Sequence, residues 1–440
     1  MTILLPRAGR NDLLIDRWEY AVATKLRCPQ SEVKPSYRRL VESVTDHWEG
    51  LGAQAMSARQ IGILAEAPVS SIYHHFGSLE QLFVVSSEEC LVAAEAWCEE
   101  QVRQLAGFRA STQGFGSYFA QLVDEWSHSQ RTLAFAWREC QLLAQRKPEF
   151  VALARRWQRM WSEFWLRVSE IFALGANTIV VERIFDTESL LHMMRWRRSI
   201  DRAALDETGR ALAAWLGGET IPDAPWRDFA HAQALQSVPD APVGDEVVMR
   251  VRQSAAHLIG VAGVAGVTHR AVAEHAGLTL GAVSHKFKTK SALLEAAFEG
   301  IYASLTAQPA SAERPATKAV RPNGADIVIQ AVERAGHGNL NDELFVAVAR
   351  DPNLSGFGAQ LRYLRGRTSR AALQTLLGDR REASILEGAL FSSYLSSQLR
   401  ACVGQSVEDA RLLITRELHH LQSLLRAEPG GSAIPSTHSQ

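Results

Sequence analysis

The chain has 440 residues, which is too long for one typical domain and favours two to four folded units. Hydrophobic residues make up 46% and charged residues 22%, which is an ordinary balance for a soluble globular protein. The formal net charge of −1 excludes a globally basic protein, so any nucleic-acid partner must be recognised through local charge.

The sequence predicts neither export nor a membrane span. Its start, MTILLPRAGRNDLL, has no apolar run long enough for a signal peptide, and no stretch approaches roughly 18 uninterrupted apolar residues. The five cysteines are scattered and form no CxxC pair, which favours reduced thiols over a disulfide framework. We therefore expect a cytoplasmic protein with no membrane partner.

Helical periodicity dominates the chain. Apolar residues recur every three or four positions, and alternating runs of β-branched residues do not appear, so the predicted fold class is all-α. Residues 217–244 concentrate Pro, Gly, Asp and Ala and are expected to form a linker, and residues 306–324 a loop. Residues 1–33 are expected to be an N-terminal extension and residues 428–440 a disordered tail.

Residues 34–83 contain the first set of short predicted helices. The first helix presents an apolar stripe on one face, made of Tyr37, Leu40, Val44 and Trp48. Ser57 is a good N-cap for the next helix, and Gln60 completes a capping box. The stretch SIYHHFGSLEQLF then carries the adjacent histidines His74 and His75.

A second set of short helices, predicted over residues 245–294, repeats the first. Residues 248–294 align with residues 37–83 at a constant shift of 211 positions without a gap. The stripe of its first helix is Val248, Val251, Ala255 and Ile259. Further pairs are Gly52 with Gly263, Ser57 with Thr268, Arg59 with Arg270, Ile61 with Val272, Ala65 with Ala276, His74 with His285, and Phe76 with Phe287. The glycine pair is expected where the first helix ends, and the register favours an internal duplication.

The stretch THRAVAEHAGLTLGAVSHKF in the second set is typical of a helix-turn-helix. Thr268 and Thr279 are N-caps of two short helices, and Gly277 suits a left-handed turn between them. The side chains expected to hold the two helices together are Val272, Ala273, Leu278 and Val283. In such a unit the second helix enters the major groove of DNA and the first spans the backbone.

Both sets resemble the DNA-binding domain of the TetR family of bacterial repressors. In that family a capped helix leads to Ala-Gly-Val-Ser, a recognition helix ends in Tyr-x-x-Phe, and a lysine opens the long fourth helix. The second set matches through Thr268, Ala276, Gly277, Leu278, Thr279, Phe287 and Lys290. The first set matches through Ser57, Ala65, Val69, Tyr73, Phe76 and Leu82.

The resemblance implies a helical body after each set, which binds a ligand and dimerises. Residues 84–216 and 295–427 are expected to be these bodies, so that one chain forms a pseudo-dimer. The internal interface is expected within residues 179–216 and 381–426. Its apolar members would be Phe185, Leu190, Leu191, Met194, Ile385, Leu386, Leu390 and Tyr394. Packing of these side chains within their own body is the alternative.

The two sets are not equivalent. The differing pairs are Glu66 and Gly277, Pro68 and Thr279, Tyr73 and Ser284, and Leu79 and Lys290. The resemblance implies that Tyr73 and Lys290 are phosphate contacts, so each set lacks one of the two that are customary in the family. A residue other than glycine in a left-handed turn costs about 1 kcal/mol. The formal charge is −1 over residues 57–83 and +3 over residues 268–294, so the second set should supply more of the salt-dependent DNA affinity. The arm of the first set is expected to help through Arg27, Lys34, Arg38 and Arg39.

The candidate DNA-binding residues lie on the short helices and their caps. In the first set they are Ser57, Arg59, Val69, Ser70, Ser71, Tyr73, His74 and His75. In the second set they are Thr268, Arg270, Thr279, Leu280, Gly281, Ala282, Ser284, His285, Lys286 and Lys290. Because the base-reading positions differ, we predict an operator with unlike half-sites. A shared metal ion is disfavoured for the adjacent histidines, since neighbouring helix residues point about 100° apart.

Large aromatic side chains make the first body the expected ligand-binding one. All 11 tryptophans fall at or before Trp226. The candidate ligand-binding residues are Tyr118, Trp126, Trp137, Trp157, Trp161 and Trp165. Rings packed between helices often leave space suited to an aromatic ligand, although plain core packing is the alternative for each of them.

The predicted function is that of a ligand-responsive transcriptional regulator, most simply a repressor. Its partners would be double-stranded DNA and a small apolar or aromatic effector, with no cofactor. No GxSxG, phosphate-binding glycine loop or paired metal motif favours an enzyme. The alternative is a TetR-type antagonist that binds a ligand or a protein and has lost specific DNA binding. Further self-association of chains stays open.

Overall fold

The computed structural model describes residues 35–108, 112–236, 245–306, 340–378, 381–402 and 405–426. Most of these residues lie in helices and none lies in a strand, which confirms the all-α prediction. The expected extension at 1–33, the expected tail at 428–440, and all but the first residue of the expected loop at 306–324 fall outside these ranges.

The first half of the chain, residues 35–236, begins with short helices and continues into a bundle of longer ones. Its helices are α2 Ser36–Thr45, α3 Ala58–Leu64, α4 Val69–Phe76, α5 Leu79–Gln104, α6 Thr112–His128, α7 Arg131–Ala144, α8 Val151–Phe172, α9 Thr178–His192, α10 Arg198–Leu216 and α11 Pro225–Gln236, with 3-10 turns η1 Pro148–Phe150 and η2 Gly175–Asn177. The long helix α5 therefore joins the short helices directly to the bundle.

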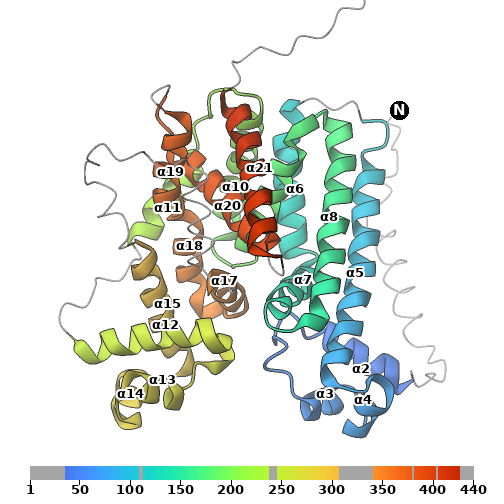
Figure 1. Cartoon of the computed structure of the whole chain (residues 1–440), viewed down its shortest axis with the longest axis vertical. Helices are drawn as coiled ribbons and strands as arrows, with labels where there is room; N and C mark the ends of the chain where they lie inside the picture. The colour runs from blue at the N-terminus through green and yellow to red at the C-terminus, as the bar shows by residue number, and fades with distance from the viewer. Residues whose placement is uncertain are drawn as a thin grey trace, which may run out of the picture.

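The second half, described from residue 245 onward, starts in the same way. Its helices are α12 Glu246–Gly266, α13 His269–Ala276, α14 Leu280–Lys286, α15 Lys290–Thr306, α17 Leu340–Arg350, α18 Ser355–Tyr363, α19 Arg367–Leu377, α20 Ile385–Ala401 and α21 Val407–Arg426, with the 3-10 turn η4 Pro352–Leu354. Figure 1 shows the halves side by side, with α2–α4 and α12–α14 at the same end of the molecule.

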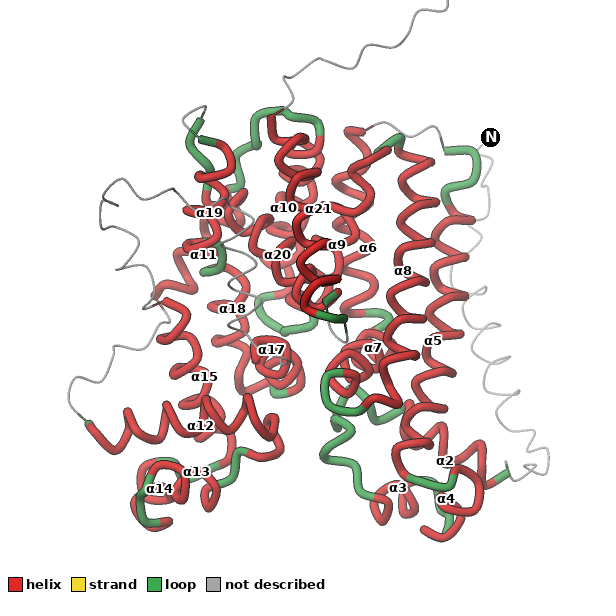
Figure 2. Tube along the Cα trace, in the orientation of Figure 1, coloured by secondary structure: helices red, strands yellow, loops and turns green. Residues whose placement is uncertain are grey.

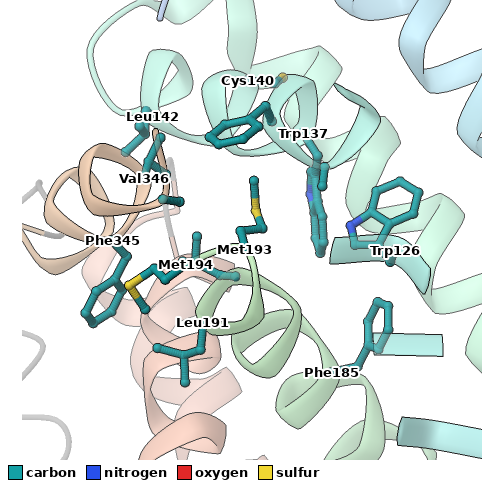
Figure 3. Close-up of a cluster of buried hydrophobic side chains, with 14 of the residues drawn as sticks. Trp126, Trp137, Cys140, Leu142, Phe185, Leu191, Met193, Met194, Phe345 and Val346 are labelled. Atoms are coloured by element: carbon teal, nitrogen blue, oxygen red, sulfur yellow. The ribbon is translucent and has the colours of Figure 1, made fainter. Parts of the chain in front are cut away.

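The halves meet along helices from the middle of the molecule. Helix α9 packs against α20, α10 also contacts α20, and α17 reaches both α7 and α9. One hydrophobic core runs through this contact, and Figure 3 shows Met193 and Met194 of the first half near Phe345 and Val346 of the second. The short helices of each half therefore pack on a hydrophobic core that both halves share.

The segment expected to be a linker contains a folded helix. Residues 225–236 form α11, which packs against α10 of the first half and α18 of the second. Its buried face includes Ala230 and Ala234, which join a small cluster with Tyr363 and Leu364. The expectation of a linker does not hold for these residues, because small alanines at helical spacing allow a close helix contact that composition alone conceals.

Two further observations concern the described residues. None of their helices is both long and apolar enough to cross a membrane. Cys90, Cys98, Cys140 and Cys402 are free thiols, and burial raises the pKa of Cys90 and of Cys140 to about 12.

Candidate nucleic-acid interface and ligand cavity

The first three-helix unit, α2 to α4, has the predicted caps and turn. Ser57 caps α3 by accepting a hydrogen bond from the Gln60 backbone N–H, and the Gln60 side chain accepts one from the Ser57 N–H, so the capping box is confirmed. Glu66 adopts φ of 49° between α3 and α4, which confirms a left-handed turn occupied by a residue other than glycine. Pro68 precedes α4 and supplies no side-chain cap.

The second three-helix unit, α12 to α14, has more favourable local chemistry. Thr268 caps α13 and Thr279 caps α14, each by accepting a backbone N–H. Gly277 adopts φ of 62° and ψ of 36° in the turn, where it pays no steric penalty. These predictions are confirmed, and they make the turn of the second unit the less strained of the two.

Equivalent arginines brace the turn in both units. Arg39 donates to the carbonyl oxygens of Ala65 and Glu66 at 2.8 and 3.1 Å. Arg250, which stands 211 positions later, donates to the carbonyl oxygens of Ala276 and Gly277. The expectation that Arg39 extends an arm towards DNA is therefore wrong, because its guanidinium is occupied by orphan carbonyls at a helix end.

Of the other three arm residues, the structure describes only Arg38. Arg38 is exposed and pairs with Glu42 one helical turn later. Arg27 and Lys34 lie outside the described residues.

The first helices of the two units end differently. Helix α2 ends at Thr45, so Gly52 lies beyond the helix. Trp48 is buried, but it belongs to the turn that follows α2 and not to the helix itself. Helix α12 continues to Gly266, with a break at Gly263, where φ is 68° and ψ is −178°. The sequence predicts that the first helix of each set ends at the glycine. In the second unit the glycine conformation interrupts α12 at Gly263, but the helix continues beyond it.

The second helices of the units expose the same positions. On α4 the exposed side chains are Val69, Ser70, Tyr73, His74 and His75. On α14 the exposed residues are Leu280, Gly281, Ser284, His285 and Lys286. Ile72 and Val283 are fully buried at equivalent positions on the opposite face. Ser71 and Ala282 are only partly exposed.

Charge and hydrogen bonding differ around these faces. Lys286 forms an exposed ion pair with Asp245 at 2.5 Å, which lowers the pKa of the aspartate chiefly through its hydrogen bond. Ser57, Arg59, Thr268, Arg270, Thr279 and Lys290 are exposed. Nε2 of His75 lies 2.7 Å from Ser36 Oγ, a hydrogen-bond distance that ties this ring to the start of α2. Within the described ranges no group of three potential metal ligands occurs.

Exchange of the turn residues tests their strain. Glu66→Gly should stabilise the first unit by about 1 kcal/mol, because glycine adopts the left-handed conformation without a Cβ clash. Gly277→Glu should destabilise the second unit by a similar amount. Native-state hydrogen exchange of the backbone amides in α3–α4 and α13–α14 measures both effects. Equal amide protection in the wild type and in the two variants would contradict the strain argument.

The first unit is held by residues from both halves. Ala53, in the loop from α2 to α3, donates its N–H to Glu139 of α7 at 3.0 Å. Figure 2 shows this loop beside α7. Arg350 of α17 binds the same Glu139 at 2.5 Å and donates to the carbonyl oxygen of Trp48 at 3.2 Å. These hydrogen bonds join the first unit to α7 and α17.

A buried ionic network links the two halves. Asp186 of α9 accepts hydrogen bonds from Arg138 of α7 and from Arg400 of α20, both at 2.6 Å. Arg400 also binds Asp342 of α17 at 2.9 Å. Burial alone would raise the pKa of the Asp186 carboxyl, but the charges of Arg400 and Arg138 outweigh it and hold that pKa well below its usual range.

Further polar contacts line the same boundary. Arg183 of α9 pairs with Glu417 of α21 at 2.8 Å. Arg362 of α18, which is 1% exposed, pairs with the buried Asp201 of α10. Thr187 donates to the Ser393 carbonyl oxygen at 2.7 Å. The contact between the halves is thus more ionic than the apolar spacing predicted.

The apolar residues expected at this boundary are mostly buried. The buried ones are Phe185, Leu190, Leu191, Met194, Leu386, Leu390 and Tyr394. Ile385 is 54% exposed, so its expected place in the interface is wrong. It is the first residue of α20, and its side chain lies on the outer face of that turn.

The aromatic residues of the first body are largely a packed core. Trp126, Trp157, Trp161 and Trp165 are at most 2% exposed, and the rings of Trp126 and Trp161 meet edge to face at 4.8 Å. Tyr118 stacks on Phe172 and donates its hydroxyl to the Gln101 carbonyl oxygen.

A cavity opens beside part of this core. Trp137, Trp161 and Trp165 line it, whereas Tyr118, Trp126 and Trp157 are not among its lining residues. Gln141 of α7, Gln145 directly after that helix, and Arg155 and Gln158 of α8 also border it. Ser397, Arg400 and Ala401 of α20 complete the wall, a contribution that the sequence reasoning missed because the second half lacks tryptophan.

One comparison with known proteins gives a match. Residues 252–297, which run from α12 into α15, match the TetR_N family, described as bacterial regulatory proteins of the tetR family. The match concerns the second three-helix unit and supports a TetR-type DNA-binding transcriptional regulator. The all-α fold is consistent with a TetR-like fold. Regulators of this family are generally not enzymes. Comparison with curated protein sequences gives no match.

Proposed function

We propose that the chain is a ligand-responsive transcriptional regulator, most simply a repressor, that carries two TetR-type DNA-binding units in one polypeptide. The observation that carries the proposal is the family match of the second unit together with the equivalent construction of the first. Buried, exposed and turn-bracing residues recur at a shift of 211 positions, as Ile72 with Val283, Tyr73 with Ser284 and Arg39 with Arg250 show. The two halves then act as an intramolecular pseudo-dimer.

The placement of the units supports a single DNA duplex as partner. Both lie at one end of the molecule (Figure 1), so α4 and α14 can face the same duplex. Paired recognition helices read successive major grooves about 34 Å apart. The candidate base-reading residues are Val69, Ser70, Ser71 and His74 on α4, and Leu280, Gly281, Ala282 and His285 on α14.

The recognition faces favour an asymmetric operator. Val69 and Ser70 are exposed on α4, whereas the matching positions of α14 hold Leu280 and Gly281. Unlike side chains at equivalent positions read unlike bases. Each half-site should therefore have its own sequence.

Selection from a random duplex library tests the function itself. The full chain should enrich one site of about 20 base pairs, built of two unlike halves one helical turn apart. Enrichment of a palindrome would contradict the asymmetric operator and leave DNA binding standing. No enrichment at low salt would favour the antagonist, a TetR-type protein without specific DNA binding.

Replacement of one phosphate-contact candidate in each unit tests which unit supplies more affinity. Lys290→Ala should weaken operator binding more than Tyr73→Phe, because only the lysine carries a positive charge whose contact with phosphate releases counterions. Lys290→Ala should also reduce the slope of log affinity against log salt concentration by about 1. Fluorescence anisotropy at several salt concentrations measures both. A larger loss for Tyr73→Phe would contradict the charge argument.

Release by a small apolar or aromatic effector is the proposed response. The cavity lies between α7, α8 and α9 of the first half and α20 of the second. Helix α7 contacts α5, which leads from the first unit, and its Glu139 binds the α2–α3 loop. A ligand can bind one conformation, in which the two DNA-binding units are displaced from their DNA-binding positions, more tightly than the other. Such a ligand shifts the population away from the DNA-bound form, to an extent set by the difference between its affinities for the two conformations.

A further inference from the structure

Two glutamates at corresponding places in the two halves each hold the loop of a three-helix unit. Glu139 of α7 accepts a hydrogen bond from the backbone N–H of Ala53 at 3.0 Å, and Glu343 of α17 accepts one from the backbone N–H of Val264. Ala53 and Val264 are equivalent at the shift of 211 positions, and each directly follows the paired glycine of its set. Both glutamates are buried, so water competes little for these hydrogen bonds.

Each glutamate is also paired with an arginine of the opposite half. Arg350, the last residue of α17, binds Glu139 at 2.5 Å, and Arg146, which follows α7, binds Glu343 at 2.6 Å. In both halves the arginine follows the glutamate by seven positions. The ion pairs are therefore reciprocal, as they are across a two-fold interface between identical subunits.

The paired glycines let the two loops approach these ion pairs closely. A Cβ atom at Gly52 would lie 2.9 Å from Oε1 of Glu139 and 3.1 Å from Nη1 of Arg350. A Cβ atom at Gly263 would lie 3.0 Å from Nη1 of Arg146. A side chain at either position would have to displace the loop or the ion pair, so glycine permits the contact in both halves.

Both ion pairs meet the two units at one place. The four charged side chains border a single cavity, together with residues of the α2–α3 loop and of α12, and α7 and α17 lie side by side there (Figure 2). Each loop is linked to a glutamate of its own half and, through that glutamate, to an arginine of the opposite half. Moving one unit relative to the other would therefore strain hydrogen bonds to charged groups, which are stronger than those between neutral groups.

We infer that the pairs Glu139–Arg350 and Glu343–Arg146 fix the separation of the two DNA-binding units and thereby determine which half-site spacing the protein selects. The four side chains are positioning residues, because they act through the loops of the units. Paired recognition helices read successive major grooves, so a fixed separation favours one spacing of the half-sites. The inference deepens the proposed function, on which the choice of operator rests, whereas the separation itself can be measured without DNA.

Removal of both negative charges tests the effect on DNA selection. In the double variant Glu139→Gln/Glu343→Gln, each amide keeps an oxygen for the loop N–H and loses the charge that binds the arginine. Among duplexes whose half-sites are centred about 10 base pairs apart or shifted by up to about three base pairs, the wild type should prefer one spacing. Its affinity should fall about tenfold when that spacing changes by two base pairs, and the affinity of the double variant less than about threefold. No preference in the wild type, or an undiminished one in the double variant, would overturn the inference.

A distance measurement on the free protein gives an answer without DNA. Spin labels at Ser70→Cys on α4 and Gly281→Cys on α14 report the separation of the units, since Ser70 is exposed and a side chain at Gly281 meets open space. Cys28→Ser and Cys402→Ser leave buried native thiols only. Pulsed electron resonance should show a narrow distance distribution with the ion pairs intact, and one about twofold broader in the double variant, because other separations become populated. Equal widths would overturn the inference.

Glu299→Gln is the matched control. Glu299 of α15 pairs with Arg252 of α12, and this partly buried ion pair joins two helices of the second half and not the two halves. The control should keep both the wild-type spacing preference and the narrow distance distribution. Equal effects of Glu299→Gln and the double variant would overturn the inference, since the loss of any partly buried charge would then suffice.

Circular dichroism and thermal unfolding check that each variant folds. If the double variant does not fold, Glu139→Gln and Glu343→Gln are measured singly, and each should broaden the distance distribution. No broadening in either single variant would overturn the inference.

The two measurements separate this inference from the proposed function. Selective DNA binding with equal distance distributions would reject the inference and leave the proposed function intact. A broader distribution in the double variant without any selective DNA binding by the wild type would reject the proposed function and support the fixed separation of the units.

Discussion

Asp186→Ala should lower the free energy of unfolding by about 3–5 kcal/mol, the range for removing one partner of a buried ion pair. The substitution leaves the buried Arg138 and Arg400 without Asp186, and Asp342 stays as the other carboxylate that Arg400 binds. Because Asp186 joins α7 and α9 to α20, the loss should also weaken the contact between the halves. Urea unfolding at neutral pH measures the change.

Asp206→Ala provides the matched control. Asp206 pairs with Arg210 at 3.2 Å on the surface of α10, and an exposed pair of this kind contributes at most a few tenths of a kcal/mol. A loss below about 1 kcal/mol in Asp186→Ala would show that the buried pairs add little beyond their own desolvation. Asp186→Leu gives a further comparison, since an apolar replacement of similar size still strands both arginines.

His192 should make the stability of the protein fall as the solution becomes acidic. Its ring is buried, and burial, aided by the charge of Arg362, lowers the pKa of His192 to about 4. The unfolded chain has a histidine pKa near about 6.5. Between about pH 6.5 and 4 the imidazole is therefore protonated in the unfolded state and neutral in the folded state. Stability from this group is complete above pH 6.5 and is lost as the pH falls through that window, by about 3 kcal/mol in all.

His192→Asn should remove this part of the pH dependence. Nδ1 of His192 lies 2.9 Å from the Glu188 carbonyl oxygen, and the asparagine amide can donate to the same acceptor. The free energy of unfolding of the variant, measured from pH 7 to 4.5, should fall less steeply than that of the wild type. His419→Asn, at an exposed position of α21, should keep the wild-type slope. Parallel curves for wild type and His192→Asn would contradict the assignment.

The sequence predicts the local structure of the three-helix units well, because short-range chemistry determines it. Ser57, Thr268 and Thr279 cap their helices through side chains three residues from the bonded N–H. The positive φ values at Glu66 and Gly277 follow from the turn that both units require. Such features depend on neighbours within a few positions, so single-sequence reasoning identifies them.

The contact between the halves could not be predicted in the same way. Its main partners are distant in the chain, as Asp186 and Arg400 or Arg183 and Glu417 show. A charged residue at an otherwise apolar helical position gives no sign of which other helix will carry its partner. The same limit explains why Ser397 of α20 was not expected at a cavity lined by tryptophans of the other half.

The contact of α9 with α20 has a further consequence, because both helices belong to one chain. Two separate subunits would dissociate on dilution, whereas tethered surfaces meet at an effective concentration set by the chain that connects them. The fraction of molecules with both halves in contact is then independent of how many copies a cell contains. A regulator built in this way keeps its full DNA affinity at low abundance. A substitution in one half changes only that half, whereas in a homodimer it would change both subunits.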